Sequence, residues 1–486
     1  MYFEQFYLTC LAHASYMIGS DGEAAVVDPQ RDVDIYLEAA EQQNLKIRHI
    51  FETHLHADFV SGHKELAART GAKIYIGAQA EAGFPHVALR DGFEVKIGRV
   101  RVRALETPGH TPESVCLVIT NEGKSSASES AQAWAVLTGD TLFIGDVGRP
   151  DLSRTHTPQQ LAGLLYDSLH QKLMSLPDAV LVYPAHGAGS LCGRAMRAEK
   201  SSTIGTERLT NYALQIASRE EFIRQLTTNL PARPDYFRED AEINRSGAGT
   251  LTELAPLEAL SPAQVQALLD EDAYVLDVRP GTRYADGHVP GSVNIALSGQ
   301  FASWAGAILG VHARPVLVGD TDAQIEEARL RLARVGIEDL RGHLAGGVVA
   351  WQEAGLALLT TPQMSVQELH EKLGAGAKRN GTNIAEIKVL DVRREGERNA
   401  GHIAQAEWKA LDAFSRGLPE IDARRTVAVH CKGGYRSMIA CGLLERAGYR
   451  NVANVVGGFD AWHSAGLPEV SPEAPVFVPE QKVVSR

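Results

Sequence analysis

Metal-ligating residue types gather in the stretch FETHLHADF, residues 51–59. His54, His56 and Asp58 alternate along it, and three further residues of these types each come directly after an apolar run. Because α/β folds place chemistry at the ends of their strands, residues far apart in sequence can meet in one site. Imidazole and carboxylate groups both bind divalent metals. The sequence therefore predicts a metal centre built from this stretch together with His110, Asp140 and His186.

A cysteine late in the chain has the surroundings of a nucleophile. Cys431 follows the apolar run TVAVH and opens the loop CKGGYR before a helical stretch. The glycines let successive backbone N–H groups turn inward, and these amides, the helix N-terminus and Arg436 all favour an anionic sulfur. Cys431 is therefore the expected catalytic nucleophile, assisted by Arg436. The loop that would cradle its sulfur adduct consists of Lys432, Gly433, Gly434 and Tyr435.

Length and composition indicate a folded protein of several domains. At 486 residues the chain is too long for one ordinary core. Apolar residues make up 44% and charged residues 22% of it, as in globular proteins. The net charge of −12 argues against nucleic acid or an anionic membrane as the main partner. We therefore expect small-molecule substrates.

The cysteines and the apolar runs indicate a cellular location. The five cysteines are scattered and form no CxxC pair, which predicts reduced thiols in the cytoplasm rather than disulfides or a thiolate zinc site. The chain begins without a basic leader, and no apolar run approaches the ~20 residues of a membrane span. We expect a protein that is neither exported nor membrane-embedded. Whether it forms a homo-oligomer is left open by the sequence.

Two kinds of domain must position these residues. Up to about residue 230, short β-branched and apolar runs alternate with turn signals, which predicts a sheet-rich α/β domain. The proline-, charge- and glycine-rich segment 230–249 marks a boundary. Beyond it the chain repeats at the spacing of a small domain duplicated in tandem. The repeated motifs are VLDVR with a later GH, at 275–288 and 389–402, and GGxxAW, at 346–351 and 457–462.

The metal-ligand pattern resembles that of the metallo-β-lactamase superfamily, whose motif THxHxDH reads THLHADF here. The resemblance covers residues 1 to about 230. In dinuclear members the residue that matches Phe59 is a histidine bound to the second metal. Phenylalanine cannot ligate, so a mononuclear centre is expected.

Among mononuclear members the chain is similar to the persulfide dioxygenases, also in the stretch GDVGRPDLS at 145–153. Two histidines and one carboxylate leave open positions on a metal, which favours non-haem iron over structural zinc. The resemblance implies one Fe(II) ion, with O2 as co-substrate, bound by His54, His110 and Asp140. It also implies that His56, Asp58 and His186 orient these ligands. Cys192, six residues past His186, is a candidate substrate contact, with an inert cysteine as the alternative.

The loop CKGGYR, together with DVR, GH and GGFDAW around it, resembles the rhodanese sulfurtransferases. That resemblance implies that Cys431 accepts sulfane sulfur as a persulfide and that Arg436 helps to bind anionic thiosulfate or sulfite. A tyrosine-phosphatase loop also pairs a cysteine with an arginine, but it needs five residues between them, whereas four intervene here. The shorter loop suits a sulfur atom.

The earlier copy of the repeat has no cysteine for this chemistry. The aligned position is Asp320, in PVLVGDTDAQ, and neither a glycine pair nor an arginine follows it. We predict a rhodanese-like domain that is silent in sulfur transfer and serves as a spacer or docking surface.

Together these patterns predict an α/β protein. An N-terminal metallo-β-lactamase αββα sandwich precedes two tandem rhodanese-type domains, each a doubly wound parallel sheet. The expected boundaries are 1–245 for the dioxygenase domain, 258–360 for the cysteine-less rhodanese-like domain, 362–470 for the sulfurtransferase domain and 471–486 for a tail.

The complete pattern resembles fusions of a persulfide dioxygenase with rhodanese-type domains. It implies that O2 oxidises a low-molecular-weight persulfide, RSSH, to sulfite and RSH. A Cys431 persulfide then converts sulfite to thiosulfate or, in the reverse direction, takes sulfur from thiosulfate. The sequence leaves the direction and the thiol open. The alternative enzyme is a metal-dependent thioester hydrolase of the hydroxyacylglutathione type, and the alternative without catalysis is a sulfur carrier or persulfide sensor.

Overall fold

The computed structural model describes residues 1–124, 132–228, 230, 232–254, 256–375, 387–422 and 424–470. The expected tail, 471–486, lies outside these residues. The chain forms two compact units, which we describe separately. The first unit comprises Met1–Pro256, Gln300–Ala313 and Arg329–Asp339, and the second comprises Leu257–Gly299, Arg314–Ala328 and Leu340–Arg486. The expected middle domain, 258–360, is therefore divided between the two units.

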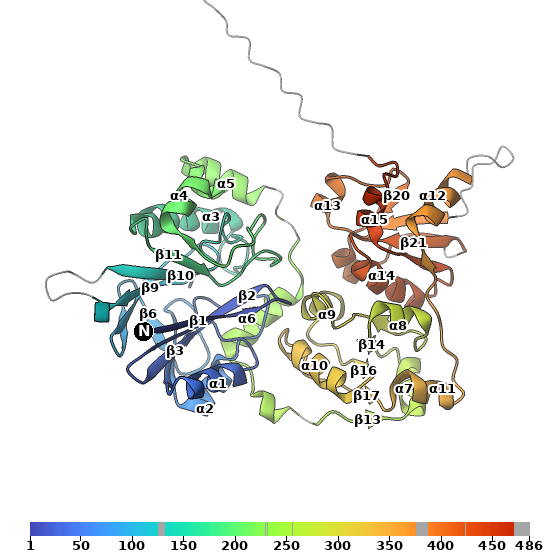
Figure 1. Ribbon diagram of the computed structural model, residues 1–486, viewed down its shortest axis with the longest axis horizontal. Helices are drawn as coiled ribbons and strands as arrows, with labels where there is room; N and C mark the ends of the chain where they lie inside the picture. The colour runs from blue at the N-terminus through green and yellow to red at the C-terminus, as the bar shows by residue number, and fades with distance from the viewer. Residues whose placement is uncertain are drawn as a thin grey trace, which may run out of the picture. The chain divides into compact units, whose positions relative to one another are not determined.

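Two six-stranded sheets pack face to face in the first unit (Figure 1). The first sheet, in the order β1-β2-β3-β4-β5-β6, is antiparallel over its first three strands and parallel beyond them. Its strands are β1 (Tyr2–Leu8), β2 (His13–Ser20), β3 (Glu23–Val27), β4 (Lys46–Phe51), β5 (Lys73–Gly77) and β6 (Val87–Leu89).

The second sheet has the order β12-β11-β10-β9-β8-β7 and is antiparallel except for the β10–β11 pair. Alternation in β8, VRVRALE, points its valines into the core, as expected for a strand with one buried face. The strands are β7 (Glu94–Ile97), β8 (Val100–Glu106), β9 (Val115–Asn121), β10 (Ala133–Gly139), β11 (Leu181–Pro184) and β12 (Ser202–Thr203).

Helices cover the outer faces of both sheets (Figure 1). The helices α1 (Asp34–Gln42) and α2 (His63–Thr70) pack on the first sheet. The second sheet is covered by α3 (Pro158–Asp167), α4 (Ile204–Thr210) and α5 (Arg219–Thr227). This is the predicted αββα sandwich. The segment that marks the predicted boundary, 230–249, contains a further helix, α6 (Tyr236–Ser246).

The second unit contains two parallel five-stranded sheets, as predicted for the duplicated domains. The first has the order β13-β17-β16-β14-β15 and consists of β13 (Ala259–Leu260), β14 (Val275–Asp277), β15 (Val293–Asn294), β16 (Val316–Val318) and β17 (Gly342–Leu344). The second has the order β18-β22-β21-β19-β20 and consists of β18 (Gln363–Met364), β19 (Ile387–Asp391), β20 (Ala406–Trp408), β21 (Thr426–His430) and β22 (Val452–Val455).

The remaining helices connect these strands. They are α7 (Pro262–Asp270), α8 (Gly281–Asp286), α9 (Phe301–Leu309), α10 (Asp322–Ala333), α11 (Gly347–Glu353), α12 (Val366–Ala375), α13 (Glu395–Asn399), α14 (Tyr435–Arg446) and α15 (Gly458–Ser464). Short 3₁₀ helices lie at Glu122–Lys124, Leu173–Ser175, Tyr212–Gln215, Leu251–Glu253 and Leu411–Arg416, and a π-helical turn at Ser168–Lys172. In the described part of the chain, no helix combines the length and apolar character needed to cross a membrane.

The repeated motifs make the same contacts in both copies. The arginine of DVR donates to its aspartate at 2.6 Å and to the glycine carbonyl of GH at 2.8 Å. The tryptophan of GGxxAW is buried and donates to a backbone carbonyl at 3.0 Å. These shared residues therefore stabilise the fold and do not transfer sulfur. They are Asp277, Arg279, Gly287 and Trp351 in the first copy, and Asp391, Arg393, Gly401 and Trp462 in the second.

The close approach of the sandwich's two halves at Gly77 gives a test of the fold. A Cβ atom there would lie 1.9 Å from the carbonyl oxygen of Glu113. The contact is with backbone, so Gly77→Ala should destabilise the first unit by at least about 2 kcal/mol. We expect its thermal unfolding midpoint to fall by roughly 5 °C. The control is Gly83→Ala, whose nearest new contact would be 3.6 Å away. Equal midpoints for the two variants would contradict this packing.

Candidate metal centre and sulfur-transfer loop

Loops at strand ends bring all six predicted metal-site residues together. They are His54, His56 and Asp58 after β4, His110 after β8, Asp140 after β10 and His186 after β11. Each is at most 5% exposed. The loops approach closely at Gly148, where a Cβ atom would lie 2.0 Å from the carbonyl oxygen of Asp140. Only glycine fits there, which places the stretch 145–153 directly against the site.

Hydrogen bonds fix the rings of two of these histidines. The hydroxyl of Thr53 donates to Asp28 at 2.9 Å, so its oxygen accepts from Nδ1 of His54 at 3.0 Å. Nδ1 of His110 donates to the carbonyl oxygen of Arg149 at 2.9 Å. Because each Nδ1 carries the proton, each Nε2 retains a lone pair for a metal.

Both lone pairs point toward one carboxylate. Nε2 of His54 lies 3.7 Å and Nε2 of His110 lies 3.4 Å from Oδ2 of Asp140. Neither Nε2 atom has a hydrogen-bond partner among the described residues. Burial lowers the pKa of both histidines and so keeps them neutral. The three side chains form a group whose potential ligand atoms lie within 4.8 Å of one another, which fits a metal held by two histidines and one carboxylate.

His186 lies between two carboxylates. Its Nδ1 is 2.8 Å from Oδ1 of Asp140, and its Nε2 is 3.0 Å from Oδ2 of Asp58. Burial alone would lower the pKa of His186, but Asp140 and Asp58 outweigh it and raise that pKa well above its usual value. Burial would raise the pKa of Asp140, but His186 and His54 hold it well below its usual range. Nδ1 of His186 lies within hydrogen-bond distance of both oxygens of Asp140, at 2.8 and 3.0 Å, and so fixes the carboxylate with Oδ2 facing His54 and His110.

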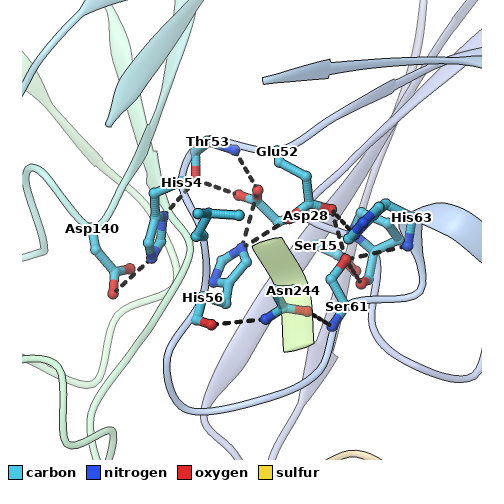
Figure 2. A network of polar contacts seen from close by, with 12 residues as sticks. Ser15, Asp28, Glu52, Thr53, His54, His56, Ser61, His63, Asp140 and Asn244 are labelled. Carbon is cyan, nitrogen blue, oxygen red and sulfur yellow. Dashed lines mark hydrogen bonds and ion pairs between the residues drawn. The ribbon is translucent and has the colours of Figure 1, made fainter. Parts of the chain in front are cut away.

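A buried network holds the remaining histidine of the motif (Figure 2). Nε2 of His56 lies 3.2 Å from Asp28 and 3.8 Å from Glu52. Glu52 also accepts from the hydroxyl of Ser61 at 2.6 Å and lies 3.4 Å from Nδ1 of His63. Burial would lower the pKa of His56, but Asp28 outweighs it, so the pKa is raised. The network lies on the side of His56 opposite to the group formed by His54, His110 and Asp140 (Figure 2). Its carboxylates, Asp28 and Glu52, compensate the positive charge of His56.

The sequence-based reasoning missed Asn244, because it lies in the segment that resembled a linker. Its Nδ2 donates to the carbonyl oxygens of His56 and Phe59, both at 2.7 Å, and its Oδ1 accepts from Ser61 N–H at 2.8 Å. One buried side chain on α6 therefore satisfies three backbone groups of the irregular ligand loop (Figure 2).

A further histidine, His13, belongs to no motif in the sequence but lies at the site. Its ring centroid is 4.1 Å from that of Phe59 and 5.4 Å from that of His186. It is fully buried, and neither ring nitrogen has a hydrogen-bond partner in the described residues. Phe59 is also fully buried and packs against His56, with the ring centroids 4.4 Å apart. An apolar ring thus occupies the position of the last histidine in the motif THxHxDH.

Cys192 lies at the metal centre and is 1% exposed. It forms a potential ligand group with Asp140 and His186, within 4.8 Å. Burial first, and then Asp58 and Asp140, raise the pKa of its thiol well above the usual value. The residue is therefore a neutral thiol beside the site, and its contact with substrate stays a prediction.

The predicted sulfur-transfer loop has the expected form in the second unit. Gly434 adopts a φ of 107° and its N–H donates to Sγ of Cys431 at 3.1 Å. The hydroxyl of Ser437 lies 3.5 Å from the same sulfur and donates to Asn454 at 2.6 Å. Cys431 itself is 1% exposed, whereas Lys432 and Gly433 are exposed. The sulfur thus lies at the base of a short loop that ends at α14.

Arg436 is engaged by a carboxylate that the sequence did not reveal. Its two terminal nitrogens donate to Glu397 at 2.5 and 2.6 Å. Burial would lower the pKa of Arg436, but Glu397 outweighs it and the pKa is raised. The guanidinium therefore stays charged near Cys431, and Glu397 offsets that charge. Its role as the binding group for an anionic donor stays a prediction.

The earlier copy has a carboxylate at the position of Cys431. Asp320 follows β16, and its N–H donates to the side chain of Gln324 at 2.8 Å. Its carboxylate lies 4.0 Å from Arg279 and 3.6 Å from Arg283. This loop contains no sulfur atom, and Asp320 is held by contacts with side chains of the same domain. Both observations agree with the prediction that this domain does not transfer sulfur.

Comparisons with known proteins agree with this architecture. Residues 261–354 and 365–465 match the rhodanese-like domain family, and residues 8–124 match the metallo-β-lactamase superfamily. Over 230 residues the chain is 31% identical to the mitochondrial persulfide dioxygenase ETHE1 of Mus musculus, covering 45% of this chain and 77% of that protein. Over 169 residues it is 35% identical to hydroxyacylglutathione hydrolase of Rhodospirillum rubrum, covering 34% of this chain and 57% of that protein.

Among solved structures, a metallo-β-lactamase from Staphylococcus aureus aligns with a TM-score of 0.63 and 30% identity, covering 71% of this chain and 98% of that one. The predicted fold class and the predicted resemblances are confirmed by these matches. The chain belongs to the family of the ETHE1 persulfide dioxygenases, within the metallo-β-lactamase superfamily, and continues into two rhodanese-like domains.

Proposed function

We propose that the chain oxidises low-molecular-weight thiol persulfides with O2 at a mononuclear Fe(II) site and transfers sulfane sulfur through Cys431. The observation that carries this proposal is the convergence of Nε2 of His54, Nε2 of His110 and Oδ2 of Asp140 in one buried group. The similarity to a persulfide dioxygenase and the rhodanese-like loop support the same reaction class.

These three residues would hold the iron. When bound, a ferrous ion supplies open coordination positions at which a persulfide and O2 can meet. The protein's part is to hold the ligands and to keep solvent out, since every group around them is buried. The imidazolium of His186 keeps Asp140 ionised and in one orientation. The buried thiol of Cys192 and the ring of Phe59 would bound the space left for the persulfide sulfur.

The proposed reactions balance. Persulfide, O2 and water give sulfite and thiol: RSSH + O2 + H2O yields RSH + H2SO3. The thiolate of Cys431 first attacks the outer sulfur of a second RSSH, which breaks that S–S bond, forms the cysteine persulfide and releases the thiol RSH. A sulfite lone pair then attacks the outer sulfur of the cysteine persulfide, the S–S bond breaks, and thiosulfate leaves with the cysteine thiolate regenerated. The amide of Gly434 would stabilise that thiolate. The reverse step, in which Cys431 takes sulfur from thiosulfate, uses the same groups.

A metal-dependent thioester hydrolase is the second candidate. It is favoured by the similarity to a hydroxyacylglutathione hydrolase and by the second ligand group, formed by His56, Asp58 and His186 within 4.8 Å. The residue that counts against it is Phe59, because the hydrolase reaction typically uses two metals and this ring removes one ligand of the second.

Oxygen uptake with a thiol persulfide tests the proposal. The anaerobically iron-loaded protein should consume O2 on addition of glutathione persulfide and release both sulfite and thiosulfate. Cys431→Ser should keep the uptake, because that residue is not a metal ligand, but accumulate sulfite as thiosulfate falls to the rate without enzyme. An iron-loaded protein that takes up no O2 with any persulfide but cleaves thioesters would replace the proposed reaction by the hydrolase.

Metal stoichiometry tests the role of Phe59. The wild-type protein should retain about one metal ion per chain after dialysis, measured by mass spectrometry of the metal content. Phe59→His restores an imidazole next to His56, Asp58 and His186, so the content should approach about two. Phe59→Leu is the matched control and should stay at the wild-type value. Two ions in the wild type would favour the dinuclear hydrolase.

The ion pair between Arg436 and Glu397 should set the preference for anionic donors. Glu397→Gln removes the charge that offsets Arg436, so the KM for thiosulfate should fall about threefold to tenfold at low ionic strength. Glu395→Gln is the control, because it removes the same charge from an exposed position of the same helix, α13. If both variants change KM equally, the pair does not tune the site. The measurement is sulfur transfer from thiosulfate to cyanide as a function of donor concentration.

A further inference from the structure

Two segments of the cysteine-less middle domain belong to the same compact unit as the metal centre. They are Gln300–Ala313, which contains α9, and Arg329–Asp339, which contains the end of α10. The middle domain cannot carry a cysteine persulfide, so sulfur transfer does not explain why these segments pack there. Their contacts with the loops of the metal centre indicate a different role.

The first contact is with the loop that carries His56 and Asp58. Directly after Phe59, the N–H of Val60 donates to the carbonyl oxygen of Arg334 at 2.7 Å. This loop has no strand partner, so each of its buried N–H groups needs an acceptor from elsewhere. Asn244 supplies the acceptor for the next N–H, that of Ser61, and the middle domain supplies the one for Val60.

Two ion pairs of opposite sense anchor this segment. The guanidinium of Arg334 donates to Asp32 through two nitrogens, both at 2.8 Å. In the second pair the middle domain supplies the carboxylate. Arg31, the residue before Asp32, donates to Glu338 at 2.6 and 3.1 Å. Arg31 is fully buried and Arg334 is 9% exposed. The carboxylates are partly exposed, with 18% for the side chain of Asp32 and 27% for that of Glu338, but each arginine is largely buried and needs its partner, since a buried charge without one is uncompensated.

The second contact is with the loop that carries His186 and Cys192. The side chain of Gln300 donates to the carbonyl oxygen of Gly189 at 3.0 Å. Along α9, a Cβ atom at Gly306 would lie 3.1 Å from the ring of Tyr236, so the helix lies directly against that ring. The side chain of Tyr236 hydrogen-bonds Ser303 of the same helix, and after burial the nearby carboxylate of Asp58 contributes to raising the pKa of its hydroxyl. α9 thus covers the side of the metal centre next to this loop.

We propose that the segments Gln300–Ala313 and Arg329–Asp339 of the middle domain form a wall of the metal centre, with Arg334 as a positioning residue for the loop that carries His56 and Asp58. The inference rests on the metal centre of the proposed function and is independent of its substrate. It assigns to the middle domain a part in the dioxygenase site in place of the sulfur transfer it has lost.

The test is Arg334→Ala in the full chain, with Arg341→Ala as the matched control, because Arg341 belongs to the same domain but pairs with Glu271 at the surface. In the metal-free protein, hydrogen exchange of peptides covering residues 56–62 should accelerate at least tenfold in Arg334→Ala only. Cobalt(II) affinity, measured by chelator competition, should fall at least fivefold. Sulfur transfer through Cys431 should stay at the wild-type rate.

Restoring the charge pair separates positioning from general stability. Arg334→Lys, and the exchanged pair Asp32→Arg with Arg334→Asp, should each recover more than half of the lost protection and cobalt affinity. Wild-type exchange and affinity in Arg334→Ala would overturn the inference, and so would equal losses in Arg341→Ala. If Arg334→Ala fails to fold, the other two variants decide, and unrecovered cobalt affinity in both would also overturn it.

The result of this test can be distinguished from a failure of the proposed persulfide oxidation. Hydrogen exchange and cobalt affinity do not involve persulfide. A wild-type protein that consumes no O2, in which Arg334→Ala still loosens the loop and weakens cobalt binding, would overturn the proposed reaction and support the wall.

Discussion

The first unit is organised around one buried carboxylate. Asp140 stays ionised where almost no water reaches it, and a charge in such a place needs compensation by other charges and hydrogen bonds. His186 supplies part of that compensation through contacts with both oxygens, and Oδ2 also faces His54 and His110. The arrangement places two neutral nitrogens and an anionic oxygen around one point. A divalent cation there would complete the charge balance, because the protein has already desolvated its ligands.

The ligand loop must be rigid although it has no regular backbone pairing. Its backbone groups are satisfied from outside the loop, by the side chain of Asn244 and by the carbonyl of Arg334. Behind the loop, Asp28 accepts from the N–H of Thr53 and lies 3.2 Å from His56, and Glu52 accepts from the hydroxyl of Ser61 (Figure 2). Because these partners come from four separate parts of the chain, the geometry of the site depends on packing of the entire unit. A hydrogen-bonded second layer of this kind fixes the orientation of first-layer ligands.

Spacing and periodicity predicted α/β domains, the six candidate metal-site residues and the sulfur-transfer loop, because strand-end motifs and glycine loops leave strong patterns in a sequence. The αββα sandwich was predicted from the family resemblance that these motifs carry. Other parts left no pattern. Asn244 acts through three backbone contacts in a segment that resembled a linker, and His13 is a single histidine without a motif. Arg334 contributes a backbone carbonyl, which every residue has. The pairing of Arg436 with Glu397 joins residues 39 positions apart, which propensity and periodicity cannot detect.

The middle domain has the rhodanese-like fold without a cysteine at the position of Cys431. Its buried hydrogen bonds at DVR and GGxxAW match those of the other copy, and Arg279 of DVR also lies 4.0 Å from Asp320, at the position of Cys431. The middle domain also covers α14 of the sulfur-transfer domain. The residues of this helix from Ser437 to Leu444 are all buried. A helix on one face of a sheet would expose its outer side, but at Gly442 this helix meets Tyr284 and Val293 of the middle domain. Tyr435 of the sulfur-transfer loop also donates to the carbonyl of Ala296 at 2.8 Å. Removing the middle domain would therefore expose an apolar helix directly behind Cys431, so its retention has a physical reason in the second unit as well.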